Sequence, residues 1–174
     1  MLPDNIIPQQ LSLFAGLLAA PGQDSLAIVE ELAQTNPWLQ DIPEELAQWG
    51  LPRWQGEHTR LFINGHPKTV CPPFESSYVH GQQNGKACSD VLALYYQIGL
   101  QPVEGVFPDY LGTLLECAAY LAEQQPVDMT SWDILWQKHL ARWVPRFARD
   151  LETHSRLRLY QQLGKQLQAL FPNV

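Results

Sequence analysis

Residues 72–78 read Pro-Pro-Phe-Glu-Ser-Ser-Tyr, and residues 107–111 read Phe-Pro-Asp-Tyr-Leu. In the first stretch two prolines fix φ and stiffen a loop that ends in an aromatic residue. The second stretch is an acidic turn that opens a long apolar helix. Neither has the arrangement of a catalytic site, and both are suited to holding a partner. They predict a binding protein.

The size and charge of the chain limit the number of domains and the kinds of partner that it can have. The chain has 174 residues, of which 45% are hydrophobic and six are tryptophan, enough for one domain with a sizeable core or for two packed lobes. The net charge of −7 argues against nucleic acid as a partner, because neutralising phosphates needs stripes of lysine and arginine. An acidic surface suits a basic partner, and it also serves solubility.

The N-terminus and the cysteines predict a cytoplasmic protein. The opening Met-Leu-Pro-Asp has no basic segment and no uninterrupted apolar run, so no secretory signal is expected. No segment approaches the ~18 apolar residues that span a bilayer. Cys71, Cys88 and Cys117 stand at unrelated spacings, which is typical of reduced thiols.

Apolar residues recur with helical period through most of the chain, and no segment alternates cleanly enough for a strand. Residues 64–85 collect Gly, Asn and Pro and are expected to form a loop. A helix is expected after this loop, and Gly99 is placed to form its left-handed C-terminal cap. The Pro/Gly connector at 100–105 is a candidate hinge, with a lobe boundary expected at 100–106. The predicted fold is all-α: a compact helical globule that comprises residues 1–174.

The C-terminal part is also expected to be helical. Thr130 and Asp133 have the spacing of a capping box, and an apolar stripe runs from Trp132 to Trp143. Pro145 is expected to kink or break this helix. His139 falls on the stripe, where a hydrogen-bonded core histidine is favoured over a catalytic base.

No motif for catalysis, metal binding or cofactor binding is complete. Residues 81–86, Gly-Gln-Gln-Asn-Gly-Lys, are one residue short of a phosphate loop and lack its Ser/Thr. The histidines and cysteines between 58 and 88 match no zinc spacing. Neither Ser76 nor Ser77 lies in a nucleophile elbow. The expectation is a protein without cofactor, metal or catalytic residues.

Two alternatives stand for each candidate binding residue. Glu75 could accept a guanidinium and Tyr78 could offer a ring with a polar tip, or Phe74 and Tyr78 could tuck the loop onto the core. Asp109 could meet a cationic partner at a lobe junction, or it could complement the dipole at the start of the following helix. Chemistry alone leaves both pairs open.

At these residues the sequence resembles the TorD/DmsD/NarJ group of redox-enzyme maturation chaperones. The similar segments are Arg60-Leu61-Phe62, Asn64-Gly65, residues 72–78, Tyr95 with Gly99-Leu100, residues 107–112 with Leu115, and the set Trp136, His139, Leu140, Trp143, Pro145, Phe147 and Tyr160. The chain departs from the family's Glu-Pro-x-Asp-His segment, because Val106, Phe107 and Tyr110 replace its Glu, Pro and His. Tyr110 can stack and donate a hydrogen bond, but it cannot become cationic near neutral pH.

The resemblance implies a TorD-like chaperone that binds the twin-arginine signal peptide, the apo form, or both, of a molybdenum-cofactor oxidoreductase until cofactor insertion and export. Its expected partner-binding residues are Phe74, Glu75, Tyr78, Glu104, Phe107, Pro108, Asp109 and Tyr110. The alternative within the family is a NarJ-type assembly chaperone that acts on the mature client. A small hydrolase or nucleotide-binding enzyme is the other class, and the chain could be a monomer or a domain-swapped dimer.

Overall fold

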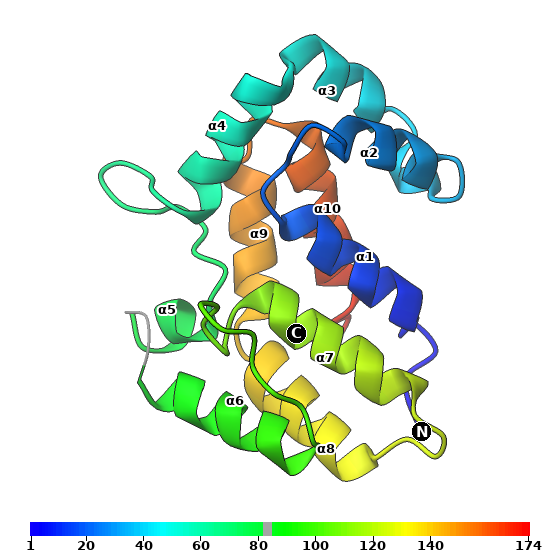
Figure 1. The fold of residues 1–174 in the computed structure, drawn as a ribbon, viewed down its shortest axis with the longest axis vertical. Coiled ribbons are helices and arrows are strands. Elements are labelled where there is room, and N and C mark those ends of the chain that lie inside the picture. The colour runs from blue at the N-terminus through cyan, green and yellow to red at the C-terminus, as the bar shows by residue number, and fades with distance from the viewer. Residues whose placement is uncertain (82–84) are drawn as a thin grey trace.

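The computed structural model describes residues 1–81 and 85–174 and is all-helical over those residues (Figure 1). Its only extended pairing within these ranges is an isolated antiparallel bridge between Phe74 and Tyr110. The elements are α1 (Pro8–Leu18), α2 (Ser25–Ala33), the 3₁₀ turn η1 (Pro37–Leu39), α3 (Ile42–Trp49), α4 (Leu51–Phe62), α5 (Glu75–Val79), α6 (Lys86–Gln97), α7 (Leu111–Glu123), α8 (Met129–Asp133), the π-helical segment η2 (Ile134–Leu140), α9 (Val144–His154) and α10 (Arg158–Ala169).

Prolines and glycines set many of these boundaries. A proline occupies the first turn of α1, α3, α4, α9 and η1, where its missing N–H has no helical partner to lose. The predicted break at Pro145 is confirmed, since this residue lies in the first turn of α9, which starts at Val144. Gly99 has φ 80° at the end of α6, which confirms the predicted left-handed cap.

Two helix pairs form the centre of the molecule: α9 packs along α10, and α1 packs along α7 (Figure 1). The α9–α10 contact is close because Gly164 has no side chain: a Cβ at this position would lie 2.6 Å from the carbonyl oxygen of Ala148. The buried apolar side chains form one cluster that runs from Ile6 to Phe171. The proposed lobe boundary at 100–106 lies in the connector between α6 and α7, and the division into lobes stays a prediction.

The structure corrects two local expectations. The side chain that caps α8 belongs to Asp128, which accepts from the N–H of Ser131 at 3.1 Å, so the helix begins before Thr130. Over its described residues, 64–81 and Gly85, the predicted loop is confirmed as an interruption, but it contains the short helix α5, which the sequence pattern did not indicate. Residues 82–84 of the candidate phosphate loop lie outside the described residues.

Aromatic packing organises the C-terminal stripe. The Trp132 and Trp136 rings stack with centroids 4.8 Å apart, and Trp136 stacks on Phe171 at 4.9 Å. The segment between Ile134 and Leu140 widens to a π-helix, in which the N–H of Ala141 donates to the carbonyl of Trp136 at 2.8 Å. The predicted stripe is therefore one buried face that crosses α8, η2 and the turn before α9.

Replacing Trp143 by alanine should lower the free energy of unfolding by about 3–5 kcal/mol. The ring is fully buried, and its Nε1–H donates to the carbonyl oxygen of His139 at 2.6 Å. Urea denaturation measures the change. Trp49→Ala is the matched control, since that ring is only partly buried and should lose less. Equal losses at the two positions would contradict the assignment of Trp143 to the centre of the core.

Candidate functional site

The two stretches that open the sequence analysis lie side by side in the fold. Their backbones pair antiparallel: the N–H of Glu75 donates to the carbonyl of Asp109 at 3.2 Å, and the N–H of Leu111 donates to that of Pro73 at 2.8 Å. From α6, the Tyr95 hydroxyl donates to the carbonyl of Pro108 at 2.7 Å. The pairing brings the starts of α5 and α7 together.

The Asp109 carboxylate seals this junction from inside. It is 0% exposed, accepts from the N–H of Ser76 at 2.8 Å through Oδ2, and accepts from the Cys88 thiol at 3.0 Å through Oδ1. Ser76 is in the first turn of α5, so Asp109 caps a helix that lies 33 residues away in the chain. It does not cap α7, whose N-terminal cap makes no side-chain hydrogen bond.

Glu75 is also turned inward. It is 2% exposed and accepts from the Nδ1 of His139 in η2 at 2.9 and 3.1 Å. Burial raises the pKa of this carboxyl, and the hydrogen bond from His139 opposes the shift. The expected core histidine is thus confirmed, and its partner is one of the predicted site residues.

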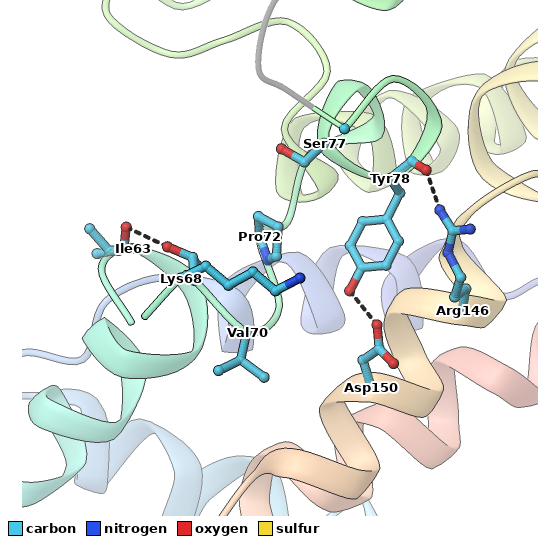
Figure 2. Close-up of a pocket in the computed structure, with 10 residues that line it drawn as sticks. Ile63, Lys68, Val70, Pro72, Ser77, Tyr78, Arg146 and Asp150 are labelled. Carbon is cyan, nitrogen blue, oxygen red and sulfur yellow. Dashed lines mark hydrogen bonds between the residues drawn. The ribbon is translucent and has the colours of Figure 1, made fainter. Parts of the chain in front are cut away.

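Tyr78 belongs to α5, and its side chain extends toward α9 (Figure 2). It forms one wall of a hollow of about 570 Å³. Its hydroxyl donates to Asp150 at 2.9 Å, and its ring lies 5.6 Å from the Trp143 ring. The Arg146 guanidinium lies over the ring and also donates to the Tyr78 carbonyl. Burial and the bond to Asp150 raise the pKa of the Tyr78 hydroxyl, so it stays protonated.

Of the remaining predicted residues, Glu104 and Phe107 are exposed, whereas Phe74, Pro108 and Tyr110 are half-buried. Phe107 is 38% exposed, and its ring meets that of Phe74 edge-on with centroids 5.8 Å apart. The Tyr110 ring is tilted against Phe74, also at 5.8 Å. We call these three rings the aromatic surface. Glu104 is exposed in the same connector, Pro108 is half-buried, and Val106 is 39% exposed. Exposed apolar side chains gathered in one short connector indicate a contact surface.

The site therefore has two layers. Glu75, Tyr78 and Asp109 hold α5 against α6, η2 and α9, whereas Phe107 and Glu104 are exposed to solvent. Direct contact of Glu75 or Asp109 with a partner stays a prediction, and the structure gives each carboxylate an internal bonding role. Sequence reasoning missed Asp150 and Arg146 as the partners of Tyr78; their only signal was i, i+4 spacing on one helix.

The side chains around Tyr78 are suited to binding a partner. Thr69 and Ser77 line the hollow beside Tyr78, and no histidine is among the described residues that do so. Within the described ranges no group of three metal-ligating side chains forms, and no helix there is long and apolar enough to cross a bilayer. Burial raises the pKa of the Cys71 and Cys117 thiols to about 12, which disfavours the reactive thiolate.

Comparison with known proteins adds three findings. The family model described as nitrate reductase delta subunit matches residues 23–149. Over 103 residues, 59% of this chain, the sequence is 31% identical to the "Probable nitrate reductase molybdenum cofactor assembly chaperone NarW" of Escherichia coli K12. The matched part spans 43% of that protein, less than half of its length. The structure of a "Putative Redox Enzyme Maturation Protein" from Archaeoglobus fulgidus matches with a TM-score of 0.73 at 26% identity, covering 97% of this chain and 96% of that one.

Asp109→Ala should lower the free energy of unfolding by about 1–3 kcal/mol, because the Ser76 N–H and the Cys88 thiol lose a buried acceptor. Asp109→Asn should lose less, since its amide oxygen can still accept one of the two bonds. Thermal or urea denaturation gives the values. Full stability combined with loss of peptide binding would show instead that Asp109 contacts the partner.

Glu75→Gln should change how stability depends on pH. Because burial raises the folded-state pKa above its ordinary value of 4.5, the folded protein holds the proton over a window in which the unfolded chain has lost it. The contribution of Glu75 to stability therefore falls as pH rises through that window. The difference in unfolding free energy between wild type and variant, measured in urea from pH 4 to 7, should decline; a difference that grows with pH would contradict this.

Proposed function

Because the chain belongs to the nitrate reductase delta subunit family, we propose that it is an assembly chaperone for a molybdenum-cofactor oxidoreductase and not an enzyme. It would bind the apo form of this client in the cytoplasm, through the client's N-terminal twin-arginine signal peptide where one is present, until the cofactor is inserted. The observation that carries the proposal is the match in fold over 97% of the chain to a protein described as acting in redox-enzyme maturation.

The aromatic surface supports this function. A twin-arginine signal joins an arginine pair to an apolar helix, so its receptor needs apolar surface beside acidic groups. Phe107, Phe74 and Tyr110 supply apolar and aromatic area at low entropy cost, and exposed Glu104 supplies a carboxylate in the same connector. Aromatic side chains carry much of the binding energy in protein interfaces.

The second candidate is a NarJ-type chaperone that acts on the mature client. The match to the nitrate reductase delta subunit model and to NarW favours a nitrate-reductase-like client for this chain. The two candidates share the client class and differ in the segment that is bound. Truncating the leader of the client abolishes binding under the first and leaves it under the second.

The experiment is a titration of the purified protein with molybdoenzyme leader peptides and with apo client that has or lacks its leader, followed by calorimetry. Phe107→Ala should weaken binding about tenfold, since interface aromatic residues are common hot spots. Its unfolding free energy should change little because the ring is 38% exposed. Tyr96→Ala is the matched control: this ring is 61% exposed on α6, outside the aromatic surface. Absence of binding to every peptide and every client form would overturn the proposed function.

A further inference from the structure

A second hollow lies between α5, α6 and η2, on a different side of α5 from the hollow beside Tyr78. Its volume is about 560 Å³, and ligand pockets usually fall between about 300 and 1,000 Å³. Glu75 and Val79 line it, and because they are four residues apart they share one side of α5. Ser77 and Tyr78 line the first hollow instead. The second hollow is therefore a separate place where a ligand could bind.

Basic side chains gather around this second hollow, which we call the basic hollow. Lys86 comes from the first turn of α6, Lys138 from η2 and Arg142 from the turn before α9, and all three are exposed. Lys86 forms an ion pair with Asp90 at 2.8 Å. Lys138 and Arg142 form no ion pair with any residue that the structure describes. Two positive charges at the hollow are thus left without a counter-ion.

The floor of the basic hollow is a buried histidine that has one nitrogen left to bond. His139 is 5% exposed, and its Nδ1 donates to the Glu75 carboxylate, which is itself 2% exposed. Nε2 of the same ring makes no hydrogen bond with any of the described residues, and the side chain lines the hollow. Buried polar groups usually have a hydrogen-bond partner. Nε2 therefore marks a position where an atom of a ligand is expected.

The positive charges on the different walls act on the same space. The Lys86 ammonium lowers the pKa of Asp90, and the charge of Lys138 adds to this shift. Burial raises the pKa of Glu75, and the charge of Arg142 is among the interactions that oppose the rise. Both carboxylates line the hollow. The positive potential of the three basic side chains therefore overlaps there, and a concave site strengthens such a potential.

The lining requires three properties of a ligand. Lys138 and Arg142 need acidic groups, and carboxylates form charge-assisted hydrogen bonds with both. Because Nδ1 of His139 donates to Glu75, Nε2 of the neutral ring is an acceptor, and a peptide N–H is a donor that suits it. The rest of the wall is apolar and suits aliphatic carbon. The apolar residues in the lining are Val79, Ala87, Ala93 and Ile134.

We infer that the basic hollow binds an acidic peptide segment of a partner protein, whose carboxylates lie against Lys138 and Arg142 and whose backbone N–H donates to Nε2 of His139. A bare phosphate ion has no carbon for the apolar wall. A flat bilayer does not reach a nitrogen of a side chain that is 5% exposed, and the net charge of −7 disfavours nucleic acid. The inference goes beyond the proposed function, in which the leader peptide is basic and binds at the aromatic surface.

A titration of labelled, capped hexaglutamate with the full chain, followed by fluorescence anisotropy, tests the inference. The wild type should bind the peptide, and less tightly as salt rises, because salt screens the attraction. The double variant Lys138→Gln/Arg142→Gln should weaken binding about fivefold, since each exposed charge contributes modestly. Ala93→Glu adds a carboxylate to the lining from an exposed position and should abolish binding. Arg149→Gln is the matched control: this arginine is exposed on α9 outside the lining, and its loss changes the net charge as much as Ala93→Glu does.

A second measurement locates the bound peptide. In nitrogen NMR spectra of the histidine rings, the Nε2 signal of His139 should shift when hexaglutamate is added. The ring of His58 serves as the control, because its Nε2 already bonds the carbonyl of Leu18 at 2.8 Å and it does not line the hollow. Equal shifts of the two rings, or no shift of His139, would contradict binding at this floor.

Several results would overturn the inference. One is that hexaglutamate does not bind the wild type at low salt, and another is that Arg149→Gln weakens binding as much as the double variant. Displacement of the peptide by an equal concentration of inorganic phosphate would show that the hollow takes a compact anion instead. Tighter binding of single-stranded DNA or of phosphatidylglycerol vesicles would show a different class of partner. The titrations with leader peptides are independent of all these results, so failure here leaves the proposed function standing.

Discussion

The pairing of residues 73–75 with 109–111 is the constraint on which the site depends. Two main-chain hydrogen bonds join these segments, and the Asp109 carboxylate closes the junction by accepting from the N–H of Ser76. A carboxylate that is removed from water must recover its lost hydration, and a backbone N–H in the first turn of a helix is a suitable donor. Because α5 is only five residues long and could not form alone, its existence depends on this contact.

The same pairing divides the predicted binding residues by role. Glu75, Tyr78 and Asp109 each find a partner on another element, namely His139, Asp150 and Ser76. Their neighbours in sequence, Phe74 and Phe107, pack with Tyr110 into a cluster of rings in which Phe107 is exposed and the other two are half-buried. Buried polar groups of this kind fix a loop in one position, and a rigid loop loses less entropy when a partner binds to the side chains it displays.

The aromatic surface is built by both paired segments. Phe74 comes from the segment before α5, and Phe107 and Tyr110 come from the connector before α7. The centre of the molecule, where α9 packs on α10 and α1 on α7, holds the helices that carry these segments.

The sequence by itself determined the helical class, the break at Pro145, the cap at Gly99 and the two stretches that form the candidate site, because periodicity and backbone restrictions act locally. It also determined the family, through several motifs in order along the chain. It left open whether Glu75 and Asp109 face a partner or the interior, because a carboxylate before a helix looks the same in either case. Only the tertiary structure decided their placement, since the donors that receive them, Ser76 N–H and His139 Nδ1, come from segments 33 and 64 residues away.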